Sequence, residues 1–514
     1  MAELLLLPFF ICFVLAVVGF LLHPPFFIYL IFVAHRREAR FGNPQAHADD
    51  RLPRQLIQLP VFNEDVGMVK RLIDSACAVD YPADKLLIQL LDDSDRAEIS
   101  FALQEYVRLK NTKINDLSLV YLHRTERTDF KAGNLNFGLH EAMKIFRQQG
   151  ESNPNEIIVS IFDADFLVPE NYLSSVVGYF ADPVVGAVQA DMTYANKNDN
   201  ILTRAAAVFQ ENIHRVDFAG RSASNHLTTF KGSAGSWRYL AMQEAGFWQG
   251  DTQIEDVDLS FAAQAKGWRI IYTDQVSCPS MLPAGYNEFK LQQRSWMKGL
   301  MEVMRKQLGP VLKSSHLSLG QRIMTMEFFL VFSLQALFMV ISHLTLIPAY
   351  YFWRVLADPY LFHKFILLLP LLLALTHIPF FAMRLGVKDE KRPEAGPGFS
   401  FSDTVFAFGL MTALFITLSY GLLEGLTGVK VHRDRTGKGG AGPNNSDGVV
   451  PAGTSVRTLK KINACEWLMA VYSLFVVYWA GSHGFIEIAA VYSVLAAIYP
   501  LNAVISFLIL PKKS

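Results

Sequence analysis

The chain has 514 residues, of which 51% are hydrophobic and 18% are charged, and its mean hydropathy is +0.23. This composition is more apolar than that of an ordinary soluble domain and predicts that part of the chain lies in lipid. The 47 basic residues balance the 47 acidic ones, which argues against a nucleic-acid-binding protein. The four cysteines form no CxxC pair, so neither a disulfide framework nor a zinc site is expected.

The first apolar run covers residues 4–34 and is interrupted only by His23, Pro24 and Pro25. It exceeds the roughly 20 residues that a spanning helix needs, so residues 1–36 are predicted to form an N-terminal transmembrane helix. A cleavable signal peptide is the alternative, but the run has no basic segment before it and no small-residue cleavage site after it. The basic residues that follow predict that the next segment is cytoplasmic.

Residues 50–320 have soluble composition, and apolar runs resume at 325–352, 360–384, 402–424, 465–481 and 486–510. Basic residues follow both 360–384 and 402–424, so both connections are expected to be cytoplasmic. We resolve this conflict by interpreting 402–424 as a re-entrant or interfacial helix, which leaves five crossings. Residues 428–461, rich in Gly, Asn and Ser, are predicted to form a mobile loop. The predicted domains are therefore 50–287 (cytoplasmic catalytic domain), 288–322 (amphipathic interface helices) and 323–514 (C-terminal transmembrane region).

Within the soluble domain, short apolar runs alternate with segments of helical periodicity. The expected strands are 55–60, 86–91 and 157–162, and the expected helices are 65–78, 97–110 and 134–148. This alternation predicts an α/β fold with a doubly wound, mostly parallel sheet. Ligands bind such sheets beyond the carboxyl ends of the strands. A polar cluster follows each expected strand there: 63–64, 92–95 and 163–165.

Asp163 and Asp165 are one residue apart at a strand end, so both carboxylates point to one side if the chain stays extended. Such a pair suits Mg²⁺ or Mn²⁺, which takes one or two carboxylates and completes its shell with water and substrate phosphates. Glu255 and Asp256 begin an expected helix that continues over 257–265, where acids also favour the helix dipole. Beside a metal-bound diphosphate, one of these carboxylates can act as general base for an acceptor hydroxyl.

Seven motifs occur in the order found in membrane-embedded family 2 glycosyltransferases, and the chain resembles the cellulose synthase and cellulose-synthase-like mannan and glucan synthase group. The resemblance is detailed over residues 50–310 and rests on these segments: Pro60-Val-Phe-Asn-Glu64, Leu91-Asp-Asp-Ser-Asp95, Lys131-Ala-Gly-Asn134, Phe162-Asp-Ala-Asp165, Gly232-Ser-Ala-Gly-Ser-Trp237-Arg, Ile254-Glu-Asp-Val-Asp258 and Gln292-Gln-Arg-Ser-Trp296.

The resemblance implies a GT-A type catalytic domain and a role for each matching residue. Asp93 would contact the nucleotide, Pro60, Phe62 and Glu64 would surround the base, and Lys131 would lie near the nucleotide. Asp163 would face the ribose and diphosphate, Asp165 would bind the metal with Asp163, and Asp256 would be the catalytic base. The implied acceptor-binding residues are Trp296, Gln292, Gln293, Glu255 and Trp237.

One position departs from the family pattern, because Ser295 precedes Trp296 where the family has arginine. Arg294 lies one place earlier, which rotates the guanidinium by about 100° on a helix. We expect Arg294 still to reach the donor phosphates through its long side chain. Residues 288–308 also form a basic amphipathic pattern, for which a helix resting on lipid headgroups is the alternative interpretation.

Together these observations predict a processive, inverting, metal-dependent hexosyltransferase that makes a β-glycan from UDP-glucose or GDP-mannose and moves it across the membrane. Its partners would be a nucleotide-sugar donor, a glycan or lipid acceptor and the membrane, with no nucleic acid. It would lie in the plasma, inner or Golgi membrane, with the catalytic domain in the cytoplasm. One alternative is transfer of a single sugar to a ceramide or polyprenyl phosphate. Another is a transporter that senses nucleotide sugars; the expected lack of buried ionisable residues in the apolar runs argues against it.

Overall fold

The computed structural model describes residues 3–35, 52–112, 118–150, 153–332, 334–356, 399–428 and 453–508. Its centre is a seven-stranded sheet with the order β3-β2-β1-β4-β6-β5-β7. Only β6 runs antiparallel to its neighbours, so the prediction of a doubly wound, mostly parallel sheet is confirmed. The strands are β1 (Arg54–Val61), β2 (Leu86–Asp92), β3 (Ser118–His123), β4 (Ile157–Ile161), β5 (Val185–Tyr194), β6 (Gly235–Arg238) and β7 (Arg269–Ser280).

Helices cover both faces of this sheet. One apolar core lies beneath α2 (Val66–Cys77), α3 (Ala97–Asn111) and α5 (Tyr172–Val177), and the other beneath α4 (Phe130–Gln148), α8 (Tyr239–Ala245) and α9 (Glu255–Ala265). Alternate residues of each strand enter opposite cores: Ile57 and Leu59 enter the first, and Leu56 enters the second. Because both faces are buried, the central strands are continuously apolar, which is why the sequence pattern revealed them. Short 3₁₀ helices connect some of these elements: η4 (Ala83–Lys85), η5 (Pro154–Glu156) and η6 (Gly178–Ala181).

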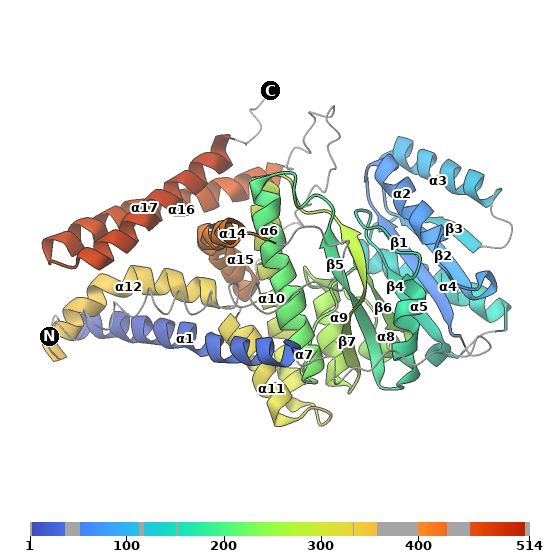
Figure 1. Cartoon of the computed structure of the whole chain (residues 1–514), viewed down its shortest axis with the longest axis horizontal. Coiled ribbons are helices and arrows are strands. Elements are labelled where there is room, and N and C mark those ends of the chain that lie inside the picture. The colour runs from blue at the N-terminus through green and yellow to red at the C-terminus, as the bar shows by residue number, and fades with distance from the viewer. Residues whose placement is uncertain are drawn as a thin grey trace.

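The apolar helices extend from one end of the α/β domain (Figure 1). Four described helices are long and apolar enough to cross a membrane, over Leu7–Ala34, Gln335–Arg354, Val456–Ser482 and Ile486–Ser506. α1 packs beside α12, and α16 packs beside α17. These helices are α1 (Leu7–His35), which follows the short 3₁₀ helix η1 (Glu3–Leu6), α12 (Gln335–Leu356), α16 (Gly453–Ser482) and α17 (Ile486–Leu508).

A third group of helices joins the sheet to the apolar helices. It comprises α6 (Ile201–Asn212), the π-helical turn η7 (Ile213–Phe218), α7 (Ala219–Ala223), α10 (Tyr286–Lys313), α11 (Leu319–Met326) and the π-helical turn η8 (Glu327–Phe332). α1 crosses α7 so closely that a Cβ on Gly220 would lie 2.6 Å from the carbonyl oxygen of Leu30. The first apolar helix therefore packs directly against the helices of the α/β domain.

The run at 402–424 forms two helices, α14 (Phe401–Ala413) and α15 (Phe415–Thr427), which are bent by 45°. This geometry fits a broken span or a re-entrant loop. The predicted crossing at 360–384 lies outside the described residues, as does 429–452 of the predicted loop. The end of that loop prediction is wrong, because α16 begins at Gly453 and makes residues 453–461 helical.

The expected lack of ionisable residues in the apolar runs is also wrong. Glu466 lies within the candidate span Val456–Ser482, and its carboxylate is 2.7 Å from Nζ of Lys290 on α10. Both side chains are 0% exposed. Asn502 of α17 also donates to Glu466, at 2.6 Å. These buried polar contacts join α10 to α16 and α17. The apolar helix α16 thus contributes to an ionisable pair of the kind that transporters also carry.

Candidate active site

The polar clusters that follow β1 and β2 contact each other at the carboxyl edge of the sheet. Asn63, with a left-handed φ of 50°, donates its backbone N–H to Oγ of Ser94 at 2.8 Å and its side-chain amide to Asp95 at 2.5 Å. Pro60 is buried near the end of β1, and Glu64 is partly buried just beyond it. β4 flanks β1 on its other side, so the segment 162–165 follows at the same edge.

Asp93 is held by two arginines from the segment after β3. Arg124 binds both of its carboxylate oxygens, at 2.8 and 2.6 Å, and Arg127 lies 3.8 Å away. The guanidinium carbon of Arg127 is also 3.4 Å from the ring centroid of Phe62. Phe62 and Asp93, two residues expected around the nucleotide, are thus connected through Arg127.

Lys131 connects the end of β4 to the glycine-rich turn before β6. Its Nζ donates to Asp163 at 2.5 Å and to the carbonyl oxygen of Gly232 at 2.9 Å. Burial lowers the pKa of Lys131, but the carboxylates of Asp163, Glu255 and Asp256 outweigh it and hold that pKa above its usual value. The lysine is therefore a fixed positive charge at the centre of an acidic cluster.

The chain does not stay extended through Asp163 and Asp165, so the condition under which both carboxylates would point to one side is not met. β4 ends at Ile161, and a turn follows, in which the N–H of Phe166 donates to the carbonyl of Asp163 at 3.0 Å. The two carboxylates consequently have different partners: Asp163 binds Lys131, whereas Asp165 accepts from Ser280 of β7 at 2.9 Å. Within the described residues, no three His, Cys, Asp or Glu side chains gather as a metal site. Two carboxylates still fit Mg²⁺ or Mn²⁺ when water and a diphosphate supply the other ligands.

Asp256 lies in the first turn of α9, directly against the glycine-rich turn. Gly232 has a left-handed φ of 74°, and a Cβ there would stand 2.8 Å from Oδ2 of Asp256. Burial, together with the neighbouring Glu255, raises the pKa of Asp256 to about 6, although Lys131 and Lys231 oppose this change. Such a carboxyl is ionised at neutral pH and is still basic enough to accept a proton from a hydroxyl in a transition state.

Lys231, which we did not predict from the sequence, interacts with both Asp256 and Trp296. Its Nζ is 4.4 Å from the ring centroid of Phe218 and 6.0 Å from that of Trp296. Its electrostatic partners are Asp256 and Asp217. Trp296 itself is 40% exposed on α10, so its ring is available to a ligand. The acidic cluster and the predicted acceptor residue therefore belong to one region.

The other four predicted acceptor residues are buried, unlike Trp296. Trp237 is 0% exposed and packs edge-on against the rings of Phe230 and Trp248. The predicted sugar contact of Trp237 is wrong, because strand β6 directs this side chain into the core beneath α8 and α9. Gln292 and Gln293 are likewise buried on α10, while Glu255 is buried beside Asp256.

The predicted reach of Arg294 toward the donor is also wrong. Its guanidinium is buried and lies 2.6 Å from the carboxylate of Glu424 on α15. Lys290 and Lys298 on the same helix are buried too, and pair with Glu466 and Glu302. Arg294 and Lys290 therefore hold α10 to α15 and α16, whereas Lys298 pairs within α10 itself. These three buried cations do not point outward toward lipid headgroups.

The residues that we missed have weak local signals. Arg124 and Arg127 follow β3, whose sequence Leu119-Val-Tyr-Leu-His123 could have been identified as a fourth parallel strand. Lys231 has no such signal, because it stands in a loop and gains its role from residues on η7, α9 and α10.

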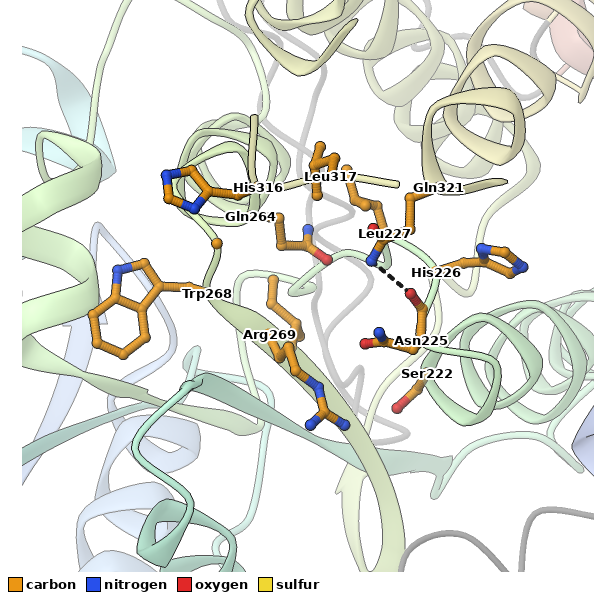
Figure 2. A pocket seen from close by; sticks show the side chains of 12 residues that line it. Ser222, Asn225, His226, Leu227, Gln264, Trp268, Arg269, His316, Leu317 and Gln321 are labelled. Atoms are coloured by element: carbon orange, nitrogen blue, oxygen red, sulfur yellow. Dashed lines mark hydrogen bonds between the residues drawn. The ribbon is translucent and has the colours of Figure 1, made fainter. Parts of the chain in front are cut away.

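A cavity of about 140 Å³ lies elsewhere, at the carboxyl end of α9 (Figure 2). Gln264, Trp268 and His316 line it, and Gln321 donates to the carbonyl of Asn225 across it at 2.8 Å. α9 has 11 residues, so its two ends are roughly 16 Å apart. The cavity is therefore separate from the cluster around Asp256.

Two family models match this chain over overlapping segments. The model described as "Glycosyl transferase family 2" matches residues 57–238, and that described as "Glycosyl transferase family group 2" matches residues 158–385. Together the two models cover residues 57–385, so this part of the chain is a family 2 glycosyltransferase domain. The matched residues include both the sheet and α10, and the resemblance noted in the sequence motifs is confirmed.

Two curated relatives are from rice, Oryza sativa subsp. japonica. "Probable glucomannan 4-beta-mannosyltransferase 7" is 33% identical over 307 residues, covering 58% of this chain and 50% of the relative. "Probable glucomannan 4-beta-mannosyltransferase 9" is 32% identical over 288 residues, covering 56% and 52% respectively. The matches thus span about half the length of these relatives.

A solved structure shares the fold of this glycosyltransferase. It is the mannosyltransferase PcManGT from Pyrobaculum calidifontis in complex with GDP-Man and Mn²⁺, with a TM-score of 0.54. The alignment covers 82% of this chain and 100% of that chain at 17% sequence identity. The similarity supports the GT-A type fold of the catalytic domain.

Proposed function

We propose that this glycosyltransferase is processive and inverting, and that it polymerises a hexose from UDP-glucose or GDP-mannose into a β-glycan that it moves across the membrane. The observation that carries this proposal is the position of Asp256, whose carboxylate lies against the Gly232 turn among Lys131, Lys231 and Glu255. The match to the rice glucomannan mannosyltransferases favours a β-linked polymer.

The donor would bind along the carboxyl edge of the sheet. Pro60, Phe62 and Glu64 would surround the base, and Asp93 would contact the nucleoside. The contact of Arg127 with the Phe62 ring supports this assignment, because an aromatic ring and a guanidinium both offer flat surfaces on which a base can stack.

The diphosphate would lie nearer Lys131. A metal held by Asp163 and Asp165, Mg²⁺ or Mn²⁺, would supply charge stabilisation for the leaving diphosphate. Lys131 would hold Asp163 in position, and its ammonium would offer a second positive charge in the transition state.

Transfer would be a single displacement. Asp256 would take the proton of an acceptor hydroxyl while the oxygen forms a bond to the anomeric carbon and the bond to the diphosphate breaks. One displacement inverts the configuration, so an α-linked donor gives a β-linked product. Trp296 would offer its exposed ring to a face of the acceptor sugar, beside the apolar helices through which the glycan would leave.

A panel of nucleotide sugars tests this function. Purified protein with Mg²⁺ or Mn²⁺ is offered each donor, and both nucleoside diphosphate release and product size are measured. Long material that a β-mannanase or β-glucanase degrades supports the proposal. An organic-extractable lipid carrying one sugar would show single transfer instead. No diphosphate release from any donor, together with uptake of a nucleotide sugar into vesicles, would indicate a transporter.

A further inference from the structure

Lys231 has an unusual environment for a lysine in a polar site. Its Nζ lies over two aromatic rings, those of Phe218 on η7 and Trp296 on α10. Its backbone N–H is fixed by Gln189 of β5, at 2.8 Å. Within the part of the chain that the structure describes, the ammonium has no hydrogen-bond or ion-pair partner.

The position of this ammonium is determined by the elements around it. Gly232 follows directly and brings the chain against Asp256, while η7 carries both Phe218 and Asp217. Asp217 is held in turn by Arg221, whose Nε donates to it at 2.7 Å. π-Helical turns occur often at functional sites. Here the turn places a ring and a carboxylate around Lys231.

We propose that Lys231 is an acceptor-site residue, whose ammonium donates hydrogen bonds to hydroxyl oxygens of the acceptor sugar and so positions that sugar between Trp296 and Asp256. An ammonium has three donors and no acceptor, and sugar hydroxyls can accept from it. A partly buried ammonium without a hydrogen-bond partner gains more from such a ligand than a fully hydrated one does. The cation–π contacts keep the Lys231 ammonium near the Trp296 ring, on which the sugar face would lie.

This inference rests on the proposed function, and it assigns Lys231 to the acceptor rather than to the donor. A lysine beside a transferase site could also hold the donor diphosphate. The two roles differ in a measurable way, because a donor ligand affects the KM for the nucleotide sugar and an acceptor ligand affects the KM for an added oligosaccharide.

The test compares Lys231→Met, Lys231→Arg and the matched control Lys70→Met. Lys70 also lies over a ring, that of Tyr106 at 4.9 Å, but on the outer helices α2 and α3. Diphosphate release is measured against donor concentration and, separately, against the concentration of short β-linked oligosaccharides. Binding of the oligosaccharides without donor is measured by calorimetry.

We expect Lys231→Met to raise the acceptor KM and Kd about tenfold to a hundredfold, the effect of losing hydrogen bonds from a charged donor. The donor KM should stay within twofold, Lys231→Arg should recover part of the acceptor affinity, and Lys70→Met should resemble wild type. A raised donor KM with unchanged acceptor binding overturns the assignment, as does wild-type acceptor binding in a folded Lys231→Met protein. If the wild-type protein itself releases no diphosphate from any donor, the proposed function fails rather than this residue's role alone.

Discussion

Oδ2 of Asp256 lies 2.8 Å from the point at which a Cβ of residue 232 would stand, and residue 232 is glycine. The left-handed φ of 74° at Gly232 is a second reason for glycine here. A single residue thus allows the backbone carbonyl that binds Lys131 and the carboxylate of Asp256 to approach each other. The glycine-rich turn and the amino end of α9 form one unit.

Gly232→Ala should abolish most of the activity because the new methyl group displaces the Asp256 carboxylate. The left-handed backbone alone costs an alanine about 1–2 kcal/mol of unfolding free energy. Gly246→Ala is the matched control, since its φ is 93° but the nearest atom to a Cβ is 3.8 Å away. Melting temperature and kcat/KM are measured for both. Equal losses of activity in the two variants would contradict a specific contact between residue 232 and Asp256.

The pH dependence of kcat/KM should follow the ionisation of the Asp256 carboxyl. Its pKa is raised to about 6 by burial and by Glu255, so kcat/KM should fall as the pH drops through about 6 and the base becomes protonated. Lys231→Met and Lys131→Met each remove a cation that stabilises the carboxylate, so both should move this acidic limb to higher pH. An acidic limb that stays in place in both variants would argue against Asp256 as the titrating base.

The same raised pKa predicts the sign of a stability effect. Between the ordinary pKa of an aspartate, near 4, and about 6, the folded state binds more protons than the unfolded state, so stability falls as the pH rises. Above pH 6 the buried charge therefore destabilises the fold, and Asp256→Asn should raise the unfolding free energy at pH 7.5 by about 1–2 kcal/mol. Thermal melts of Asp256→Asn and wild type at pH 7.5 measure this change in stability. A lower melting temperature for Asp256→Asn would show that the carboxylate stabilises the fold instead.

Arg124 should be important for stability because it binds both carboxylate oxygens of buried Asp93. Arg124→Met should cost about 3–5 kcal/mol, since Asp93 would lose its closest partner. The double variant with Asp93→Asn should recover part of this loss. Arg108→Met is the control, because its pair with Glu105 is exposed and solvent-screened and should contribute little to stability. An Arg124→Met protein as stable as wild type would contradict the strength of this pair.

Arg294 should affect stability and leave donor binding unchanged, since it pairs with Glu424 of α15. Arg294→Met and Glu424→Gln should lower the melting temperature by similar amounts, and the donor KM should stay within twofold in both. A tenfold rise of the donor KM in Arg294→Met alone, at an unchanged melting temperature, would restore the interpretation that this arginine binds the diphosphate.

The sequence was most informative where local pattern and tertiary structure agree. The three strands that it predicted are buried on both faces and therefore read as continuous apolar runs, and the motif order identified the family. It failed where partners are distant in the chain. Glu424 lies 130 positions after Arg294, so nothing local indicated that pair. The burial of Trp237 follows from β6 running antiparallel between β4 and β5, which spacing does not predict.

Backbone conformation was the other limit. Asp129 and Phe130 adopt left-handed φ values of 55° and 48°, and α4 consequently begins at Phe130 rather than at 134. That earlier start places Lys131 in the first helical turn, from which it reaches Asp163. Neither residue is glycine, so the sequence carried no sign of the turn.

The most direct test of the central claim is the rate of nucleoside diphosphate release by Asp256→Asn, compared with wild type and with the matched control Asp251→Asn, an exposed acid near α9. All three are measured with the best donor and acceptor at pH 7.5. If Asp256 is the base, kcat of Asp256→Asn should fall at least 10²-fold, which is the effect of losing a general base. This variant should still bind the donor normally, and Asp251→Asn should retain wild-type activity. Near wild-type turnover by a folded Asp256→Asn protein would contradict the account.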